Sequence, residues 1–381
     1  MRTVVVGGGI VGLACAVELA DRGADVVVCE RGSPGDGSTA RAVGGIRTQF
    51  STPVNVDLSL RSRRVWTDFE AHFGVDIGLR RTGYLFAARE AETATALRAA
   101  ARMQSARGGD TRILTPTAAT EVCPGLRAEE FAIATYSPGD CFADPNLALQ
   151  GYLDAARSAG VDLRADTPVA DVLVAGDAVG GVETPAGEIR ADAVVNAAGP
   201  WASEVAAMAD VDVPVVPRRR QALVAAPKRS VPETDPLTID LDSGAYFRPE
   251  RDGNAVVGGH FSEADPAADP GGFSTAADLD WTATALARAG DLATYFGPES
   301  RAKRGWAGLY AVTPDDHPVV GESRPGFYQA VGFSGHGFQH APAVGEVVAA
   351  LVAGETPPVD PAPLSGERFA TGDLLAERNV A

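Results

Sequence analysis

Lysine is almost absent from this chain of 381 residues. Only Lys228 and Lys303 are lysines, against 31 arginines, and the formal net charge is −17. Such a negative chain repels nucleic acid and anionic lipid, which argues against both as partners. An acidic, lysine-poor surface with abundant alanine indicates a halophile's cytoplasm, where salt screens the self-repulsion. An arginine-biased genome is the alternative explanation for the same composition.

Cysteines and long apolar runs are also scarce. The four cysteines, Cys15, Cys29, Cys123 and Cys141, form no CxxC pair and show no metal-site spacing, so we predict no metal and a reducing compartment. No run approaches the roughly 20 apolar residues of a membrane helix, and the first residues lack the layout of a signal peptide. The sequence therefore predicts a cytoplasmic protein without a membrane span. Its length suits about two domains.

The first 30 residues carry the strongest motif. Three valines, residues 4–6, predict a buried strand, and Gly7, Gly9 and Gly12 follow it with the spacing GxGxxG. A helix and a second strand come next, and Glu30 ends that strand 18 residues after Gly12. In such a unit the glycines admit a pyrophosphate and the acid binds a ribose hydroxyl. The stretch therefore predicts dinucleotide binding, with a purely structural glycine turn as the alternative. The motif alone does not separate FAD from NAD.

The rest of the chain alternates between helical and strand patterns. Helices are predicted over 53–73, 91–107, 115–122, 142–160, 275–295 and 341–352, and strands over 81–88, 169–174, 181–184, 188–190, 192–201, 214–225, 245–249, 255–261 and 327–333. The region 305–320, which contains Pro314-Asp315-Asp316-His317-Pro318, is predicted to be irregular, with His317 in a structural role. The chain from Gly354 onward is proline-rich and polar, which predicts a surface location.

Three further motifs follow the nucleotide unit in order. They are NAAGPW at 196–201, GLYAVTPDDHPVVG at 308–321 and GFSGHGF at 332–338. With these motifs the chain, over roughly residues 2–354, resembles the D-amino-acid-oxidase-like flavoprotein superfamily. It is most similar to monomeric sarcosine oxidase, glycine oxidase and the β subunit of heterotetrameric sarcosine oxidase. The resemblance implies an α/β (α+β) fold. A discontinuous Rossmann-like FAD-binding domain would span 1–80, 141–221 and 303–381, and a second substrate domain, built on a mixed β-sheet, would span 81–140 and 222–302.

The resemblance also implies which residues hold the FAD. They are Gly7, Gly9, Gly12 and Glu30 at the ADP half, Ser38 and Arg41 in the loop that passes the flavin, Val169 at the adenine, Ala198 and Gly199 at the nucleotide, and Gly335, His336, Gly337 and Phe338 at the pyrimidine side of the ring. The helix that follows would direct its positive end at the reduced ring. Monomeric sarcosine oxidase attaches its flavin through a cysteine where this chain has Gly308, so the FAD is predicted to be noncovalent.

At the substrate side the resemblance implies four residues. Arg47 matches an arginine that grips the substrate carboxylate, and a guanidinium does this bidentately. Tyr246 and His260 match polar residues beside the flavin, and Gln339 stands where many relatives have a carboxylate-binding lysine. Val256 replaces the lysine credited with activating oxygen. A surface arginine and a satisfied structural histidine are the alternatives for Arg47 and His260.

The predicted function is the FAD-dependent oxidation of the C–N bond of a small amino acid, N-alkylated or secondary. Hydride passes to the flavin and the imine is hydrolysed, with His260 placed to take the ammonium proton because the reference pKa of histidine is about 6.5. The acceptor is oxygen or, since Val256 replaces a lysine, another carrier such as a quinone; a partner subunit stays open. Two other functions also stay open: a 2-hydroxy-acid dehydrogenase, and a flavin-bound assembly protein without turnover.

Overall fold

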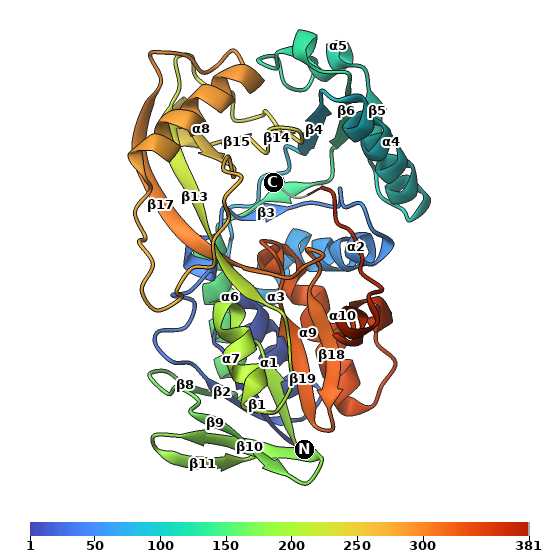
Figure 1. Cartoon of the computed structure of the whole chain (residues 1–381), viewed down its shortest axis with the longest axis vertical. Coiled ribbons are helices and arrows are strands. Elements are labelled where there is room, and N and C mark those ends of the chain that lie inside the picture. The colour runs from blue at the N-terminus through green and yellow to red at the C-terminus, as the bar shows by residue number, and fades with distance from the viewer. Residues whose placement is uncertain (380–381) are drawn as a thin grey trace.

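The computed structural model describes residues 1–379. Figure 1 shows a large sheet in each half of the molecule, with helices packed around both. The lower sheet has the strand order β18-β19-β12-β1-β2-β8. Its strands are β1 (Arg2–Val6), β2 (Asp25–Cys29), β8 (Asp162–Arg164), β12 (Ala193–Asn196), β18 (Val319–Arg324) and β19 (Phe327–Val331). The predicted α/β fold class, with its Rossmann-like sheet, is confirmed.

All strands of the lower sheet except β18 run parallel. The carboxyl ends of parallel strands meet at one edge, which is where ligands bind in such sheets. Gly7, Glu30 and Ala197 each follow one of these strands directly, and Gly332 follows β19. Motifs up to about 330 residues apart in the sequence are thereby brought to one edge.

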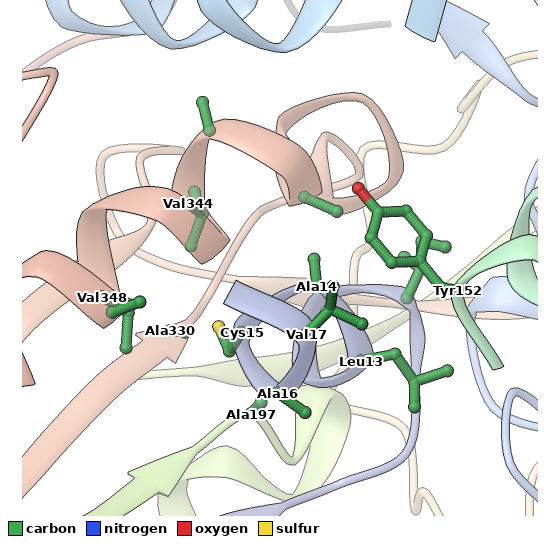
Figure 2. Packing of buried hydrophobic residues seen from close by; sticks show 14 of the residues in the cluster. Leu13, Ala14, Cys15, Ala16, Val17, Tyr152, Ala197, Ala330, Val344 and Val348 are labelled. Atoms are coloured by element: carbon green, nitrogen blue, oxygen red, sulfur yellow. The ribbon is translucent and has the colours of Figure 1, made fainter. Parts of the chain in front are cut away.

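Two helices cross on one face of this sheet, α1 (Ile10–Asp21) and α9 (Gly337–Ala353). Figure 2 shows Ala14 and Cys15 of α1 facing Val344 and Val348 of α9. A Cβ added at Gly345 would lie 2.8 Å from the backbone carbonyl group of Ala14, so the two helices are in close contact. Small residues on both helices permit this approach.

Helix α9 begins at Gly337, four residues before the predicted start. The predicted start at residue 341 would have placed Pro342 in the first turn, where proline is favoured. In the structure Pro342 lies inside the helix, and two side chains of α2 (Pro53–Thr67) satisfy the backbone around it. Ser62 Oγ accepts from Ala343 N at 3.1 Å, and Trp66 Nε1 donates to Gln339 O at 2.9 Å. Gly337 and Phe338 of the GHGF motif therefore lie in the first turn of α9, and His336 is its N-cap.

The upper sheet has the order β17-β13-β16-β15-β14-β4-β6-β5. Its strands are β4 (Tyr84–Ala88), β5 (Arg112–Leu114), β6 (Ile133–Ser137), β13 (Val216–Ala226), β14 (Leu237–Asp240), β15 (Tyr246–Pro249), β16 (Ala255–Gly258) and β17 (Arg301–Val312). The prediction of an irregular region from 305 was wrong, because antiparallel pairing with β13 holds β17 extended. Within the strand part of the predicted region, residues 305–312, Gly305 and Gly308 weaken the strand pattern, because glycine is unfavourable inside a strand. Both β13 and β17 cross domain boundaries predicted at 221 and 302, while the division itself stays a prediction.

The remaining elements connect or cover the sheets. They are α3 (Phe69–Phe73), α4 (Ala91–Ala106), α5 (Pro116–Ala119), α6 (Pro145–Ser158), α7 (Ala202–Ala207), α8 (Leu279–Leu292), α10 (Glu367–Thr371), the pair β3 (Gly45–Ile46) and β7 (Cys141–Phe142), and the meander β9 (Asp171–Ala175), β10 (Ala178–Thr184) and β11 (Gly187–Arg190). The single helix predicted over 53–73 is two helices, since α2 ends before Asp68. Within residues 1–379, no helix combines the length and apolar character needed to cross a membrane.

The chain after Gly354 does not lie wholly on the surface as predicted. Arg368, Glu377 and Asn379 are buried, and each makes several hydrogen bonds to earlier parts of the chain. Composition pointed to a surface segment because proline and polar residues are usually exposed. Burial is possible here because buried polar groups are stable when they are hydrogen-bonded.

Candidate active site

A cavity of about 650 Å³ is lined by residues of both sheets. Of the residues predicted to hold the FAD, all except Gly12 line it. Gly12 lies beneath the cavity, where an added Cβ would collide with the carbonyl oxygen of Gly7. Its absent side chain thus allows close packing of α1 against the turn after β1.

The nucleotide end is shaped by glycines and one acid. Gly7 has φ +111°, and a Cβ there would lie 2.5 Å from Ala197 O. At Gly9 the space is open, since the nearest atom to an added Cβ is Thr39 Oγ1 at 3.4 Å. Glu30 accepts from Gly8 N at 2.8 Å and from Gly32 N at 2.9 Å. These bonds fix its carboxylate at the edge where a ribose would bind.

The loop after Glu30 is pinned to β17 on the far side of the cavity. Ser38 Oγ donates to Leu309 O at 2.7 Å, and Trp306 Nε1 donates to Arg41 O at 3.0 Å. An added Cβ at Gly308 would lie 2.9 Å from Arg41 Cβ, so the strand passes close to the loop here. The loop and the strand thus line the cavity together.

The flavin end is formed by the start of α9. His336 is its N-cap, and burial lowers the pKa of His336 well below the ordinary value, with the Arg47 charge lowering it further. The neutral ring lies 3.2 Å from Arg47 Nη2, which is a donor, so Nε2 accepts and the proton is assigned to Nδ1. Nδ1 is buried and has no partner among residues 1–379. A buried donor of this kind requires an acceptor.

Arg47 follows β3 and is buried in the cavity wall. Its Nη1 donates to Gln49 O at 2.6 Å, its Nη2 donates to Asn379 O at 2.6 Å, and its guanidinium lies 3.9 Å above the ring of Phe50. Gln339 Oε1 accepts from the Arg47 backbone N at 2.7 Å. No acidic side chain among residues 1–379 forms an ion pair with it. Burial lowers the pKa of Arg47, and nearby Glu377 opposes the effect.

Three tyrosines share the cavity lining with Arg47: Tyr84, Tyr246 and Tyr310. Burial raises the pKa of each, so all three hydroxyls stay protonated. Each phenol packs against a glycine, at Gly45, Gly258 and Gly335 respectively. Sequence reasoning included Tyr246 and missed the other two. The signal for Tyr310 was its place in the GLY motif; Tyr84 stood in a strand with no distinguishing pattern.

His260 does not line the cavity. Its Nε2 lies 3.8 Å from Asp265 Oδ1, and Asp265 also binds Arg220 Nη1 at 2.7 Å. Partial burial and the Arg220 charge lower the pKa of His260. The structure therefore joins Arg47 to Gln339 and places Tyr246 in the lining of the same cavity. His260 lies behind that lining, in a polar cluster whose Arg220 reaches the cavity. Within the described residues, no group of three or more His, Cys, Asp or Glu side chains is arranged to hold a metal.

Comparison with known proteins identifies the family of the chain. The model of the FAD dependent oxidoreductase family, DAO, matches residues 2–351. The chain belongs to this family. The resemblance drawn from the motifs is thereby confirmed, and the protein is an oxidoreductase whose cofactor is FAD. The cavity fits that cofactor, with an open glycine turn and Glu30 at one end and the unpartnered donor of His336 at the other.

Several relatives are similar over nearly the whole chain. Glycine oxidase of Geobacillus kaustophilus is 32% identical, with 95% of both chains covered. The FAD-dependent oxidoreductase domain-containing protein 1 of Xenopus laevis is 32% identical over 99% of this chain and 84% of its own. The crystal structure of L-proline dehydrogenase from P. horikoshii superposes with a TM-score of 0.88 at 33% identity, covering 98% of each chain. The chain therefore belongs among FAD-dependent amino acid oxidoreductases.

Proposed function

We propose that this enzyme oxidises the C–N bond of a small secondary or N-alkylated amino acid. The observation that carries the proposal is Arg47, a buried guanidinium in the cavity wall with no acidic partner among residues 1–379. A buried charge is costly unless it is paired, so the site is complete only when an anion binds. The carboxylate of an amino acid supplies that anion and matches the planar guanidinium.

Two features favour a secondary or N-alkylated amine. The site around Arg47 is walled by the three tyrosines and by the apolar side chains of Leu237 and Ile239, which leaves an apolar flank for carbon attached to nitrogen. One similar structure is that of an L-proline dehydrogenase, whose named substrate is a secondary amino acid. The glycine oxidase relative supports the wider class of small amino acids.

The chain's own residues bind and orient. Arg47 fixes the carboxylate, Gln339 holds the Arg47 backbone, and the protonated tyrosines offer hydroxyls to the amine. The apolar flank and the neighbouring Arg47 charge favour the neutral amine over the ammonium, because desolvation and a nearby cation both penalise a positive charge. Bound FAD supplies the acceptor for a hydride from the carbon beside nitrogen, and water then hydrolyses the imine. We leave His260 out of the proton transfer because it lies outside the cavity lining.

The test is anaerobic bleaching of the FAD-loaded protein by a panel of glycine, N-methylglycine, proline of both hands, larger amino acids and 2-hydroxy acids. We expect bleaching by a secondary or N-methylated amino acid. Bleaching by hydroxy acids alone would select the C–O alternative. Bleaching by dithionite but by no member of the panel would favour an assembly protein. Acid precipitation should leave all FAD in the supernatant, since Gly308 offers no attachment point.

A further inference from the structure

The segment 373–379 returns from α10 to the candidate substrate site. In Figure 1 the red chain after α10 runs past α2 towards β3. There the carbonyl of Asn379 accepts from Arg47 Nη2 at 2.6 Å, and Asn379 Nδ2 donates to Gln49 O at 3.1 Å. Asn379 is almost fully buried. A backbone oxygen thus occupies one N–H donor of a guanidinium that has no acidic partner among residues 1–379.

Glu377 docks this segment at the start of α2. Its Oε1 accepts from Ser51 N and Ser51 Oγ, both at 2.7 Å, and its Oε2 accepts from Asn55 Nδ2 at 3.0 Å. The carboxylate also accepts from Thr52 Oγ1 at 3.3 Å and from Asn379 N at 3.1 Å. The side chain is fully buried and lies at the positive end of the helix. These contacts hold Asn379 in place.

The PDDHP loop provides a second dock. Asp315 Oδ2 accepts from Arg368 Nε at 2.7 Å and from Leu375 N at 3.3 Å. His317 Nε2 contacts Thr52 Oγ1 at 2.8 Å, which links the loop to the site of Glu377. The loop thus contacts Arg368 of α10 and Leu375 directly, and reaches the site of Glu377 through Thr52.

The N–H donors of Arg47 determine whether it can bind a carboxylate bidentately. A guanidinium has five N–H groups, and both of its bidentate edges use Nη2. In the structure one Nη2 hydrogen goes to Asn379 O and the other to His336 Nε2. Neither edge is therefore free for a carboxylate. Bidentate binding requires at least one of these contacts to yield, and the buried His336 ring is packed edge-on against Phe50, with the ring centroids 4.8 Å apart.

We propose that segment 373–379 is an internal competitor for the substrate carboxylate, and that Asn379 leaves Arg47 when substrate binds. The inference rests on the proposed role of Arg47. The proposal predicts how the segment changes the affinity for substrate. The observed dissociation constant equals the intrinsic one divided by the fraction of molecules in which the segment has moved away. Weakening its dock therefore tightens substrate binding.

The first test is Glu377→Gln, in which an amide N–H replaces an acceptor that faces Ser51 and Asn55. We expect Kd for methoxyacetate, an unreactive carboxylate with an ether oxygen in place of the amine, to fall about 3- to 10-fold, and KM to fall in parallel. The probe is followed through the flavin absorption spectrum. Glu367→Gln, an exposed position in α10, is the matched control and should leave Kd unchanged. A Kd that rises or stays constant in Glu377→Gln overturns the proposal.

The second test uses the unaltered FAD-loaded protein, so it does not depend on a variant that folds. Amide hydrogen exchange of a peptide covering 373–379 is measured with and without saturating methoxyacetate. We expect faster exchange with the probe, because the bond from Arg378 N to Ser51 Oγ opens with the segment. Slower or equal exchange contradicts the inference while leaving the substrate class intact. Absence of any flavin spectral change with methoxyacetate contradicts the proposed role of Arg47 itself.

Discussion

Two buried arginines, Arg47 in the cavity wall and Arg368 in α10, are 7% and 6% exposed, yet their surroundings differ. All N–H donors of the Arg368 guanidinium are hydrogen-bonded. Its Nε and Nη2 hold the two oxygens of Asp315 at 2.7 and 3.1 Å, and the carbonyls of Leu364, Ser365 and His317 take the rest. Arg47 has two carbonyls and a neutral imidazole.

The difference separates a structural cation from a binding one. A guanidinium with a bidentate carboxylate and three carbonyls needs nothing further. One that meets only weak dipoles keeps its charge uncompensated, which disfavours the free protein and favours an anionic ligand. The cavity lies beside Arg47 and not beside Arg368, in agreement with this division.

The largest effect should come from Arg368→Met. Removing this cation leaves the buried carboxylate of Asp315 without its ion pair, and breaking a buried pair costs about 3–5 kcal/mol. Denaturant unfolding of the FAD-loaded variant should show a loss of this order. Arg47→Met should cost less than about 1 kcal/mol, because no acid loses its partner. Equal losses of unfolding free energy in the two variants would contradict the distinction between a structural and a binding arginine.

Asp140, a buried carboxyl, extends the comparison of buried charged groups. Burial raises the pKa of Asp140 to about 7, although Arg63 and Thr48 pull it downward. A carboxyl whose folded pKa lies above its unfolded value contributes stability that is complete at about pH 4 and lost as pH rises to 7. The unaltered protein should therefore lose about 2 kcal/mol from this group between pH 5 and 7, and Asp140→Asn should not.

The measurement is the free energy of unfolding at each pH for both proteins. Asp110→Asn is the control, since Asp110 lies at the same 3.2 Å from Arg63 but is more exposed. Parallel pH profiles for Asp140→Asn and the unaltered protein would show that Asp140 is ionised at little cost.

Arg47→Lys tests the proposed role of Arg47 in binding the substrate carboxylate. An ammonium cannot reproduce the bidentate fork, so Kd for methoxyacetate and KM for substrate should rise roughly 10- to 100-fold. FAD content should stay the same, because the fold of the nucleotide end does not depend on Arg47. Arg368→Lys should lower stability without raising Kd, because Arg368 contacts the dock of segment 373–379 and does not line the cavity. Unchanged affinity in Arg47→Lys would mean that the carboxylate is held elsewhere.

The smallest effect concerns a missing cation. Val256 is buried on β16, outside the cavity lining but on the same face as Gly258, which packs against Tyr246. The motif resemblance implies a lysine at this position in oxygen-activating flavoproteins. A cation beside a flavin favours superoxide formation electrostatically. Reduced protein should therefore reoxidise more slowly in air than with a quinone, and Val256→Lys should speed the oxygen reaction several-fold. Stopped-flow reoxidation decides this. Equal rates with air and quinone in the unaltered protein would make the missing lysine irrelevant.

The local parts of this account could be predicted from sequence and the long-range parts could not. The strands and glycines of the first 30 residues interact with near neighbours, so their pattern predicted β1, α1 and β2. The start of α9 was misplaced because Ser62 and Trp66, more than 270 residues earlier, satisfy the backbone around Pro342. The contact of Asn379 with Arg47 spans 332 residues and has no motif. The halophilic character stays a prediction, tested by the melting temperature in rising KCl.

The central claim, that Arg47 holds a substrate carboxylate, is tested most directly by paired ligands. Whichever amino acid bleaches the flavin anaerobically is compared with the same amine lacking its carboxylate: proline with pyrrolidine, or N-methylglycine with dimethylamine. The account predicts that the amino acid half-saturates the bleaching at a concentration at least about 10-fold lower. An amine that bleaches the flavin as readily as its amino acid would contradict it.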